Sequence, residues 1–134
     1  MDIFNRYILK LKVNGLKNCG LHGNLLLNEL FVRYGGTAPE LVQGYITVGE
    51  SACWHVWVEL EGQTYDVVRR FMVDGGNAWG ENFAYLREKP EAGAEEDAEV
   101  SAQYELYTAD KAEFWRKSSY KMRNLRAKTM RSLF

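Results

Sequence analysis

Residues 19 to 66 constrain the fold most, because they place three chemically reactive side chains on successive predicted elements. Cys19 stands at the beginning of an apolar-periodic run that ends at Tyr34, which is typical of an amphipathic helix. His55 lies in an alternating, strand-like segment, and Asp66 lies on the strand that is predicted to follow it. A helix that bears the cysteine can therefore pack on a sheet that bears the histidine and the aspartate, so that the three side chains converge.

The helix at the start of this stretch has the clearest predicted boundaries. Asn18 is a residue type that caps helix N-termini, and Gly35 is a residue type that ends helices. Apolar residues between them recur at helical spacing and predict one buried stripe: Leu26, Leu27, Leu30, Phe31 and Tyr34. An earlier amphipathic helix is predicted over residues 2 to 12, ending at Gly15.

Three consecutive antiparallel strands are predicted next. The first spans residues 41 to 48, and the second is centred on His55, where apolar and mixed positions alternate. Glu61-Gly62 predicts a tight hairpin into a third strand over residues 63 to 69. Because successive side chains of a strand point to opposite faces, Trp57 is expected to share the face of His55.

The last third of the chain is polarised in charge. Residues 88 to 109 carry one basic and seven acidic side chains, whereas residues 110 to 134 carry eight basic and two acidic ones. The stretch from 88 to 102 has little apolar content and predicts a flexible acidic linker. At 134 residues the whole chain is expected to be one domain, with a core over residues 1 to 87.

Residues 103 to 134 predict a final strand followed by a basic amphipathic helix. The strand is expected over residues 103 to 107, and Asp110 with Glu113 predicts a capping box at the start of the helix. One stripe of this helix is apolar: Trp115, Met122, Leu125 and Leu133. Four roles fit residues 110 to 134, namely self-association, binding of an acidic partner, binding of a membrane surface, and attraction to the acidic linker. Nucleic acid is not expected, because no nucleic-acid-binding motif accompanies the charge.

The remaining bulk features predict a cytoplasmic protein with reduced cysteines. No apolar run is long enough to span a bilayer, and the N-terminus lacks the basic-then-apolar layout of a signal peptide. Two cysteines do not make a disulfide framework. Cys53 is expected to be a buried or partly buried strand residue.

The chemistry predicted for the three reactive side chains is nucleophilic catalysis by a thiolate. A free cysteine titrates near pH ~8.5, and a helix N-terminus together with an imidazolium lowers its pKa to roughly 3.5 to 7.5. Cys19 is expected at such a terminus, where His55 would pair with the thiolate and later protonate the leaving amine. Asp66 would accept a hydrogen bond from the other ring nitrogen, with Asp74 as the second candidate for this role.

Several neighbouring residues are candidates for binding the oxyanion or the substrate. The backbone N–H of Cys19 would donate to the developing oxyanion, and the side-chain amide of Asn14 or Asn18 would supply a second donor. His22, one helical turn after the cysteine, and Trp57 are further candidates for these contacts. A surface position on the helix fits His22 equally well.

The same stretch contains three short motifs: Leu41-Val42-x-Gly44-Tyr45, His55-Val56-Trp57-Val58-Glu59 and Tyr65-Asp66. Together with Cys19 and its helix, they resemble the transglutaminase-like branch of the papain-like cysteine enzymes. The closest likeness is to small members related to lasso-peptide leader peptidases and bacterial transglutaminase-like proteins. Those small peptidases usually carry a basic-plus-hydroxyl pair shortly after the cysteine, where this chain has Leu21-His22-Gly23-Asn24, and no glutamine precedes Cys19 at the papain-like oxyanion position.

The resemblance implies an α+β fold in which a central helix bearing the cysteine packs on an antiparallel sheet. It also implies a triad of Cys19, His55 and Asp66 that acts on carboxamides of a peptide or protein through an acyl-enzyme, without a cofactor. Release to water would make the protein a peptidase or a glutamine amidase. Release to an amine, as in a transglutaminase, is the alternative.

Two hypotheses from other functional classes fit the same residues. The first is a non-catalytic module that keeps the scaffold and binds a partner through its basic helix. The second is a tetrahedral zinc site built from two pairs, Cys19 with His22 and Cys53 with His55, because each pair shares a face of its helix or strand. The zinc hypothesis leaves Asp66 without a role.

Overall fold

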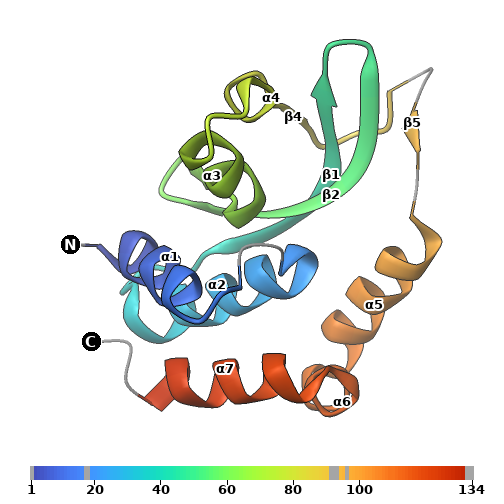
Figure 1. Ribbon diagram of the computed structural model, residues 1–134. Helices are drawn as coiled ribbons and strands as arrows, with labels where there is room; N and C mark the ends of the chain where they lie inside the picture. The colour runs from blue at the N-terminus through green and yellow to red at the C-terminus, as the bar shows by residue number, and fades with distance from the viewer. Residues whose placement is uncertain (1, 17–18, 91–93, 96, 132–134) are drawn as a thin grey trace.

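The computed structural model describes residues 2–16, 19–90, 94–95 and 97–131, and it is mixed α+β. Figure 1 shows helix α2 (Gly20–Tyr34) near the middle of the molecule, with the sheet above it and the C-terminal helix α7 (Tyr120–Arg131) below it. Helix α2 contacts the first two strands as well as α1, α3 and α7. The predicted α+β class, with a central helix against an antiparallel sheet, is confirmed.

Both predicted N-terminal helices are present. Helix α1 spans Ile3–Val13, and the Asp2 carboxylate caps it by accepting a hydrogen bond from the backbone N–H of Asn5 at 2.8 Å. Helix α2 buries the predicted stripe almost completely, and only Tyr34 stays partly exposed. Cys19 is the N-cap residue of α2 rather than part of its first turn, and the predicted cap Asn18 lies outside the described residues.

The sheet is antiparallel over four strands in the order β3-β2-β1-β4. The strands are β1 (Glu40–Val48), β2 (Ser51–Leu60), β3 (Gln63–Tyr65) and β4 (Ala84–Leu86), and the short β5 (Ala94–Glu95) pairs in parallel with β2. The predicted hairpin is present, with left-handed φ angles of 51° at Glu61 and 79° at Gly62. The first two strands and this hairpin match the sequence prediction.

The predicted third strand over residues 63 to 69 is wrong beyond Tyr65. Asp66 turns the chain into helix α3 (Val67–Asp74), because its carboxylate accepts a hydrogen bond from the backbone N–H of Val68 at 3.0 Å. This is the usual N-cap contact, and it ends the ladder. A short helix, α4 (Ala78–Glu81), follows before the chain enters β4.

Because Gly44 of β1 has no side chain, the chain at Leu86 and the Trp57 ring can approach it closely. It pairs with His55, and a Cβ at Gly44 would lie 2.4 Å from the carbonyl oxygen of Leu86 and 2.6 Å from the Trp57 ring. Because such distances are too short for any side chain, β4 and the indole ring can take these positions only over a glycine.

The C-terminal third differs from the prediction. Helix α5 spans Ala98–Ala109, so the predicted strand over residues 103 to 107 is wrong, and residues 98 to 102 of the expected linker are helical. Asp97 begins this helix by accepting hydrogen bonds from two backbone N–H groups of its first turn. The predicted long basic helix is divided into α6 (Lys111–Lys117) and α7, because Ser118 is extended, with φ −70° and ψ 160°.

The basic segment belongs to the core. Phe114, Trp115 and Leu125 are buried against α2, and the Tyr34 hydroxyl donates a hydrogen bond to the carbonyl oxygen of Met130 at 3.1 Å. Asp110 caps α6 as predicted, and Leu133 of the predicted stripe lies outside the described residues. Within the part of the chain that the structure describes, no helix has the length and apolarity needed to cross a membrane.

Candidate active site

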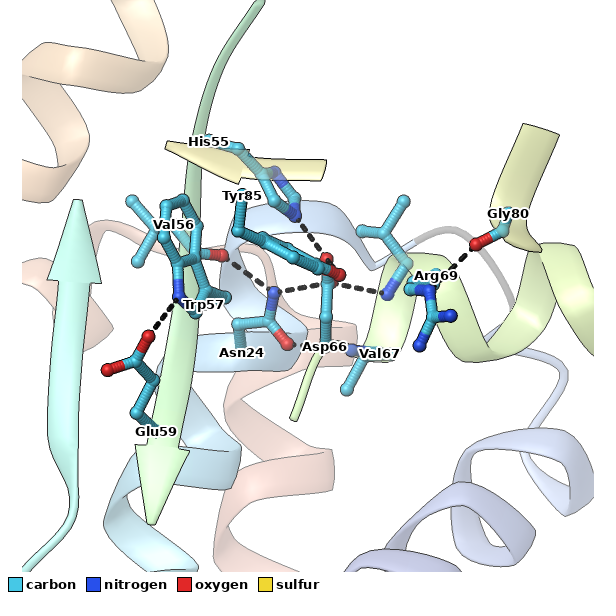
Figure 2. A network of polar contacts seen from close by, with 11 residues as sticks. Asn24, His55, Val56, Trp57, Glu59, Asp66, Val67, Arg69, Gly80 and Tyr85 are labelled. Atoms are coloured by element: carbon cyan, nitrogen blue, oxygen red, sulfur yellow. Dashed lines mark hydrogen bonds and ion pairs between the residues drawn. The ribbon is translucent and has the colours of Figure 1, made fainter. Parts of the chain in front are cut away.

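The imidazole of His55 and the carboxylate of Asp66 form the centre of the candidate site (Figure 2). His55 Nε2 lies 2.8 Å from Asp66 Oδ2, and the side chains are 15% and 1% exposed, respectively. His55 comes from β2, and Asp66 comes from the junction of β3 and α3. The hairpin between β2 and β3 therefore brings together two residues that are eleven positions apart, as the sequence predicted.

The Asp66 carboxylate receives four hydrogen bonds. Its Oδ1 accepts from Asn24 Nδ2 at 2.9 Å and from the backbone N–H of Val68 at 3.0 Å. Its Oδ2 accepts from the Tyr85 hydroxyl at 2.9 Å and from His55 Nε2. Burial acts to raise the pKa of Asp66, but the hydrogen bond and charge of His55, with the bonds from Asn24 and Tyr85, lower it below its ordinary 3.8.

The ionised state of Asp66 fixes the tautomer of His55. A carboxylate that accepts four hydrogen bonds has no proton to give, so Nε2 must carry the hydrogen of the neutral imidazole. Burial and the adjacent Asp66 charge also raise the pKa of Tyr85, which keeps its hydroxyl a donor. The basic atom of His55 is therefore Nδ1, on the side of the ring away from Asp66.

Asn24 is the residue that holds this centre to helix α2. It is fully buried, and its Nδ2 also donates to the carbonyl oxygen of Val56 at 2.8 Å, while its Oδ1 accepts from the backbone N–H of Val67 at 2.8 Å. One amide of α2 thus contacts β2, which carries His55, and the first residue of α3, which follows Asp66 (Figure 2).

The sequence prediction missed both Asn24 and Tyr85. Asn24 lies on the same face of α2 as Leu27 and Phe31, so the available signal was a polar residue inside an apolar stripe. Tyr85 sits in the three-residue strand β4 and gives no comparable local signal.

Trp57 packs behind the imidazole. It shares the predicted face with His55, and the two rings stack with their centroids 6.3 Å apart and an interplanar angle of 27°. The indole is completely buried, and its ring centroid lies 4.9 Å from that of Tyr85. Its Nε1 donates a hydrogen bond to Glu59 Oε1 at 3.3 Å. Because no surface of Trp57 is exposed, it supports His55 rather than contacting a substrate.

Cys19 lies at the start of α2 and is partly exposed. Its sulfur occupies the space above Gly23, since a Cβ at Gly23 would lie 2.4 Å from Sγ and 3.3 Å from Val67 Cγ1. The thiol therefore packs near the residue that follows Asp66. Among the described residues, no hydrogen bond joins Sγ to His55.

The predicted lowering of the Cys19 pKa is wrong for this conformation. Burial raises the pKa of the thiol from 9.0 to about 11, and a backbone hydrogen bond offsets only part of that change. Removing a thiolate from water disfavours it more than the helix terminus favours it. At neutral pH the thiol is therefore protonated.

The structure places the other predicted site residues away from this centre. Asn14 caps the C-terminus of α1, and its amide donates to Lys10 O at 2.8 Å. His22 contacts α6: its Nε2 lies 3.1 Å from Ser118 Oγ, and its ring centroid lies 5.0 Å from that of Phe114. Burial lowers the pKa of His22. Asp74 forms ion pairs with two basic side chains, those of Lys12 and Arg70.

The two cysteines and two histidines do not assemble as a zinc site. Cys53 is exposed on β2, contrary to the prediction that it is buried or partly buried, because its side chain points away from the α2 face on which Trp54 and Val56 pack. No three side chains of the metal-binding types (His, Cys, Asp and Glu) are grouped suitably for a metal ion anywhere in the described ranges.

Comparison with known proteins supplies no relative for this chain. No family model, no curated protein and no solved structure matches it. The α+β class follows from the helices and the sheet themselves. None of these comparisons links the chain to the transglutaminase-like enzymes.

Proposed function

We propose that this protein is a transglutaminase-like cysteine hydrolase of amide bonds, either a peptidase or a glutamine amidase. Cys19 is the nucleophile, His55 the acid–base group and Asp66 the orienting carboxylate. The observation that carries this proposal is the 2.8 Å contact between His55 Nε2 and the buried Asp66 carboxylate. It holds the imidazole in one tautomer and leaves Nδ1 as its basic atom.

The position of the thiol supports the same assignment. Sγ packs above Gly23 and near Val67, so it lies next to the segment that begins at the orienting carboxylate. The polar contacts of Asn24 connect the helix of Cys19 to the strand of His55. Hydrogen bonds between catalytic groups are often long in free enzymes and shorten in the substrate complex, which is the step required here between Sγ and Nδ1.

Because the thiol is protonated at neutral pH, the reaction begins with general-base catalysis rather than with a preformed ion pair. His55 Nδ1 takes the Sγ proton while sulfur attacks the carbonyl carbon, and Asp66 stabilises the imidazolium. The imidazolium then protonates the leaving nitrogen, the C–N bond breaks, and a thioester remains. Water attacks the thioester and gives its proton to Nδ1; the C–S bond breaks, and the thiol regains a proton.

The proposal is tested by incubating the protein with a peptide library that contains glutamine and following cleavage, glutamine deamidation and amine incorporation by mass spectrometry. Cys19→Ala and His55→Ala are expected to lower turnover by about 10³-fold or more, as removal of a nucleophile or base does. Cys53→Ala is the matched control and should retain activity. Incorporation of a supplied amine would identify acyl transfer in place of hydrolysis.

One observation favours a second candidate, a non-catalytic binding module. The thiol has a raised pKa and lacks a described hydrogen bond to the imidazole. A wild-type protein with no turnover beyond that of Cys19→Ala on the whole library would favour this module over the enzyme.

A further inference from the structure

A cleft of about 430 Å³ opens at Gly20, the residue that follows Cys19. It is bordered by Gly20 at the start of α2, by side chains of α3, and by the loop that follows α3 at residues 75 and 77. The hydrogen bonds and core contacts described above do not fill this cleft.

The α3 side of the cleft is apolar. Val68, Phe71 and Met72 have the i, i+3, i+4 spacing of one helical face, and all three are only half-buried. Among the residues that the structure describes, no charged side chain lines the cleft. The two arginines of α3 are engaged elsewhere, since Arg69 donates to the carbonyl oxygen of Gly80 at 2.7 Å and Arg70 pairs with Asp74.

The cleft is continuous with the surroundings of the thiol. Val67 lines it and also lies close to the position of Sγ above Gly23. Gly20 directly follows Cys19 in a left-handed conformation, with φ 52°, and no described atom lies within 4 Å of the point where its Cβ would be. A substrate backbone can therefore approach the peptide bond between Cys19 and Gly20.

We propose that this cleft is a substrate subsite that binds an apolar side chain adjacent to the amide that Cys19 attacks. The inference rests on the proposed function and adds the substrate class to it. Side chains of the size of leucine, methionine or phenylalanine would bury apolar surface against α3. A carboxylate in the same place would lose hydration without gaining a partner.

The test uses a series of chloroacetamides whose amide nitrogen carries hydrogen, isobutyl, benzyl or carboxymethyl. In each reaction the thiolate displaces chloride and forms an S–C bond, and the thiol proton goes to the buffer. The labelling rates of Cys19 and of exposed Cys53 are measured in the same molecule by mass spectrometry. Differences in intrinsic reactivity between the reagents cancel in the ratio of the two rates. The effect of the thiol pKa values is the same for every reagent, so it cancels when the ratios are compared across the series.

We expect the Cys19-to-Cys53 ratio to be about tenfold higher for the benzyl than for the carboxymethyl reagent. Met72→Asp should abolish this preference, and Met72→Gln, which keeps the shape of the side chain, should weaken it. Val32→Asp, at an exposed apolar position of α2, is the matched control and should leave it unchanged. A ratio that does not depend on the nitrogen substituent, or a Cys19 that no reagent labels, would overturn the inference.

His55→Ala separates this inference from the proposed function. If His55 is the base, the variant should slow Cys19 labelling by every reagent and leave the apolar preference intact. Labelling that is insensitive to His55→Ala but still prefers the benzyl reagent would contradict the proposed function alone. Labelling that depends on His55 without any preference would contradict the subsite alone.

Discussion

Two buried carboxylates form polar networks on different faces of helix α2, and their partners differ: Glu29 belongs to the helix, and Asp66 is bound to it through Asn24. Glu29 is 5% exposed and Asp66 is 4% exposed. Glu29 accepts hydrogen bonds from Arg126 at 2.6 Å and from the Trp115 indole at 2.8 Å. Asp66 accepts from an imidazole, an amide, a phenol and a backbone N–H.

The difference lies in the main partner of each carboxylate. Glu29 pairs with the guanidinium of Arg126, and this ion pair links α2 to the C-terminal helix α7. Asp66 instead pairs with the imidazole of His55, the side-chain type that most often serves as a general acid or base. The two carboxylates are almost equally buried, so it is the partner side chain, and not burial, that distinguishes them.

The positions of these contacts on α2 explain how one helix serves both. Asn24 and Glu29 are five residues apart, which places them about 140° apart around the helix axis. The face of Asn24 meets the candidate site, and the face of Glu29 meets α6 and α7. The two networks can therefore be altered independently.

The largest expected effect separates the two carboxylates by activity. Asp66→Asn should lower turnover by about 10³ to 10⁴-fold, because an amide in place of the carboxylate favours the wrong imidazole tautomer. Glu29→Gln should leave turnover within a few-fold of wild type, and the comparison is made from kcat on a substrate found in the library screen. Equal losses in the two variants would remove the distinction between them.

Asn24→Ala is expected to have the next largest effect. It leaves the buried carbonyl oxygen of Val56 and the N–H of Val67 without partners, at roughly 1–3 kcal/mol each, and it raises the pKa of Asp66 toward its ordinary value. The readouts are thermal denaturation and ¹⁵N NMR of the His55 tautomer.

Thr129→Val is the matched control for Asn24→Ala, since Thr129 is fully buried and its hydroxyl donates only to Leu125 O in α7. It should lower stability without moving the His55 resonances. An unchanged His55 tautomer ratio and Asp66 pKa in Asn24→Ala would limit Asn24 to a packing role.

Breaking the structural pair should change stability alone. Arg126→Met leaves the Glu29 carboxylate with the indole donor only, and we expect a loss of about 1–3 kcal/mol in the free energy of unfolding. The double variant Glu29→Gln, Arg126→Met should recover part of that loss. Urea denaturation measures both, and a stability equal to wild type for Arg126→Met would show that water replaces the guanidinium.

The same contacts change the expectation for a truncated chain. The sequence predicted that residues 110 to 134 form a separate basic helix that serves association or partner binding. Because α6 and α7 bury Phe114, Trp115 and Leu125, a chain ending at residue 109 should lose cooperative thermal unfolding. Circular dichroism during heating provides the measurement, and a sharp transition in the truncated chain would contradict the core role.

The smallest expected effect concerns the thiol, and its sign follows from burial. The folded state raises the pKa of Cys19 from 9.0 to about 11, so the neutral thiol is favoured by folding. The resulting stabilisation, of about 3 kcal/mol, should be fully present below pH 9 and be lost as the pH rises through 11. In Cys19→Ala the corresponding slope between these pH values should disappear, as measured by urea denaturation at each pH.

The contribution of Asp66 to stability changes with pH in the opposite direction. Its pKa is lowered in the folded state, so its contribution is present above the ordinary value of 3.8 and is lost as the pH falls below it. The difference between wild type and Asp66→Asn in the free energy of unfolding at acid pH measures this contribution of Asp66. Glu29→Gln provides the comparison for a buried carboxylate outside the candidate site.

The sequence by itself determined the elements whose signals are local. The periodicity of α2, the alternation of β2 and the Glu61-Gly62 hairpin are set by neighbouring residues, and they were sufficient to predict the pairing of His55 with Asp66. Prediction failed at residues 66 to 69 and 103 to 107, because the capping contacts of Asp66 and Asp97 turn the chain into helices there.

Only the tertiary structure decided the environment of the reactive groups. The donors to Asp66 come from α2, β2, β4 and its own helix, and no spacing in the sequence connects Asn24 or Tyr85 to it. The raised pKa of Cys19 likewise depends on how much water reaches the sulfur once α2 and α3 are packed. Local patterns determine which elements form, whereas desolvation and long-range hydrogen bonds depend on how those elements are brought together.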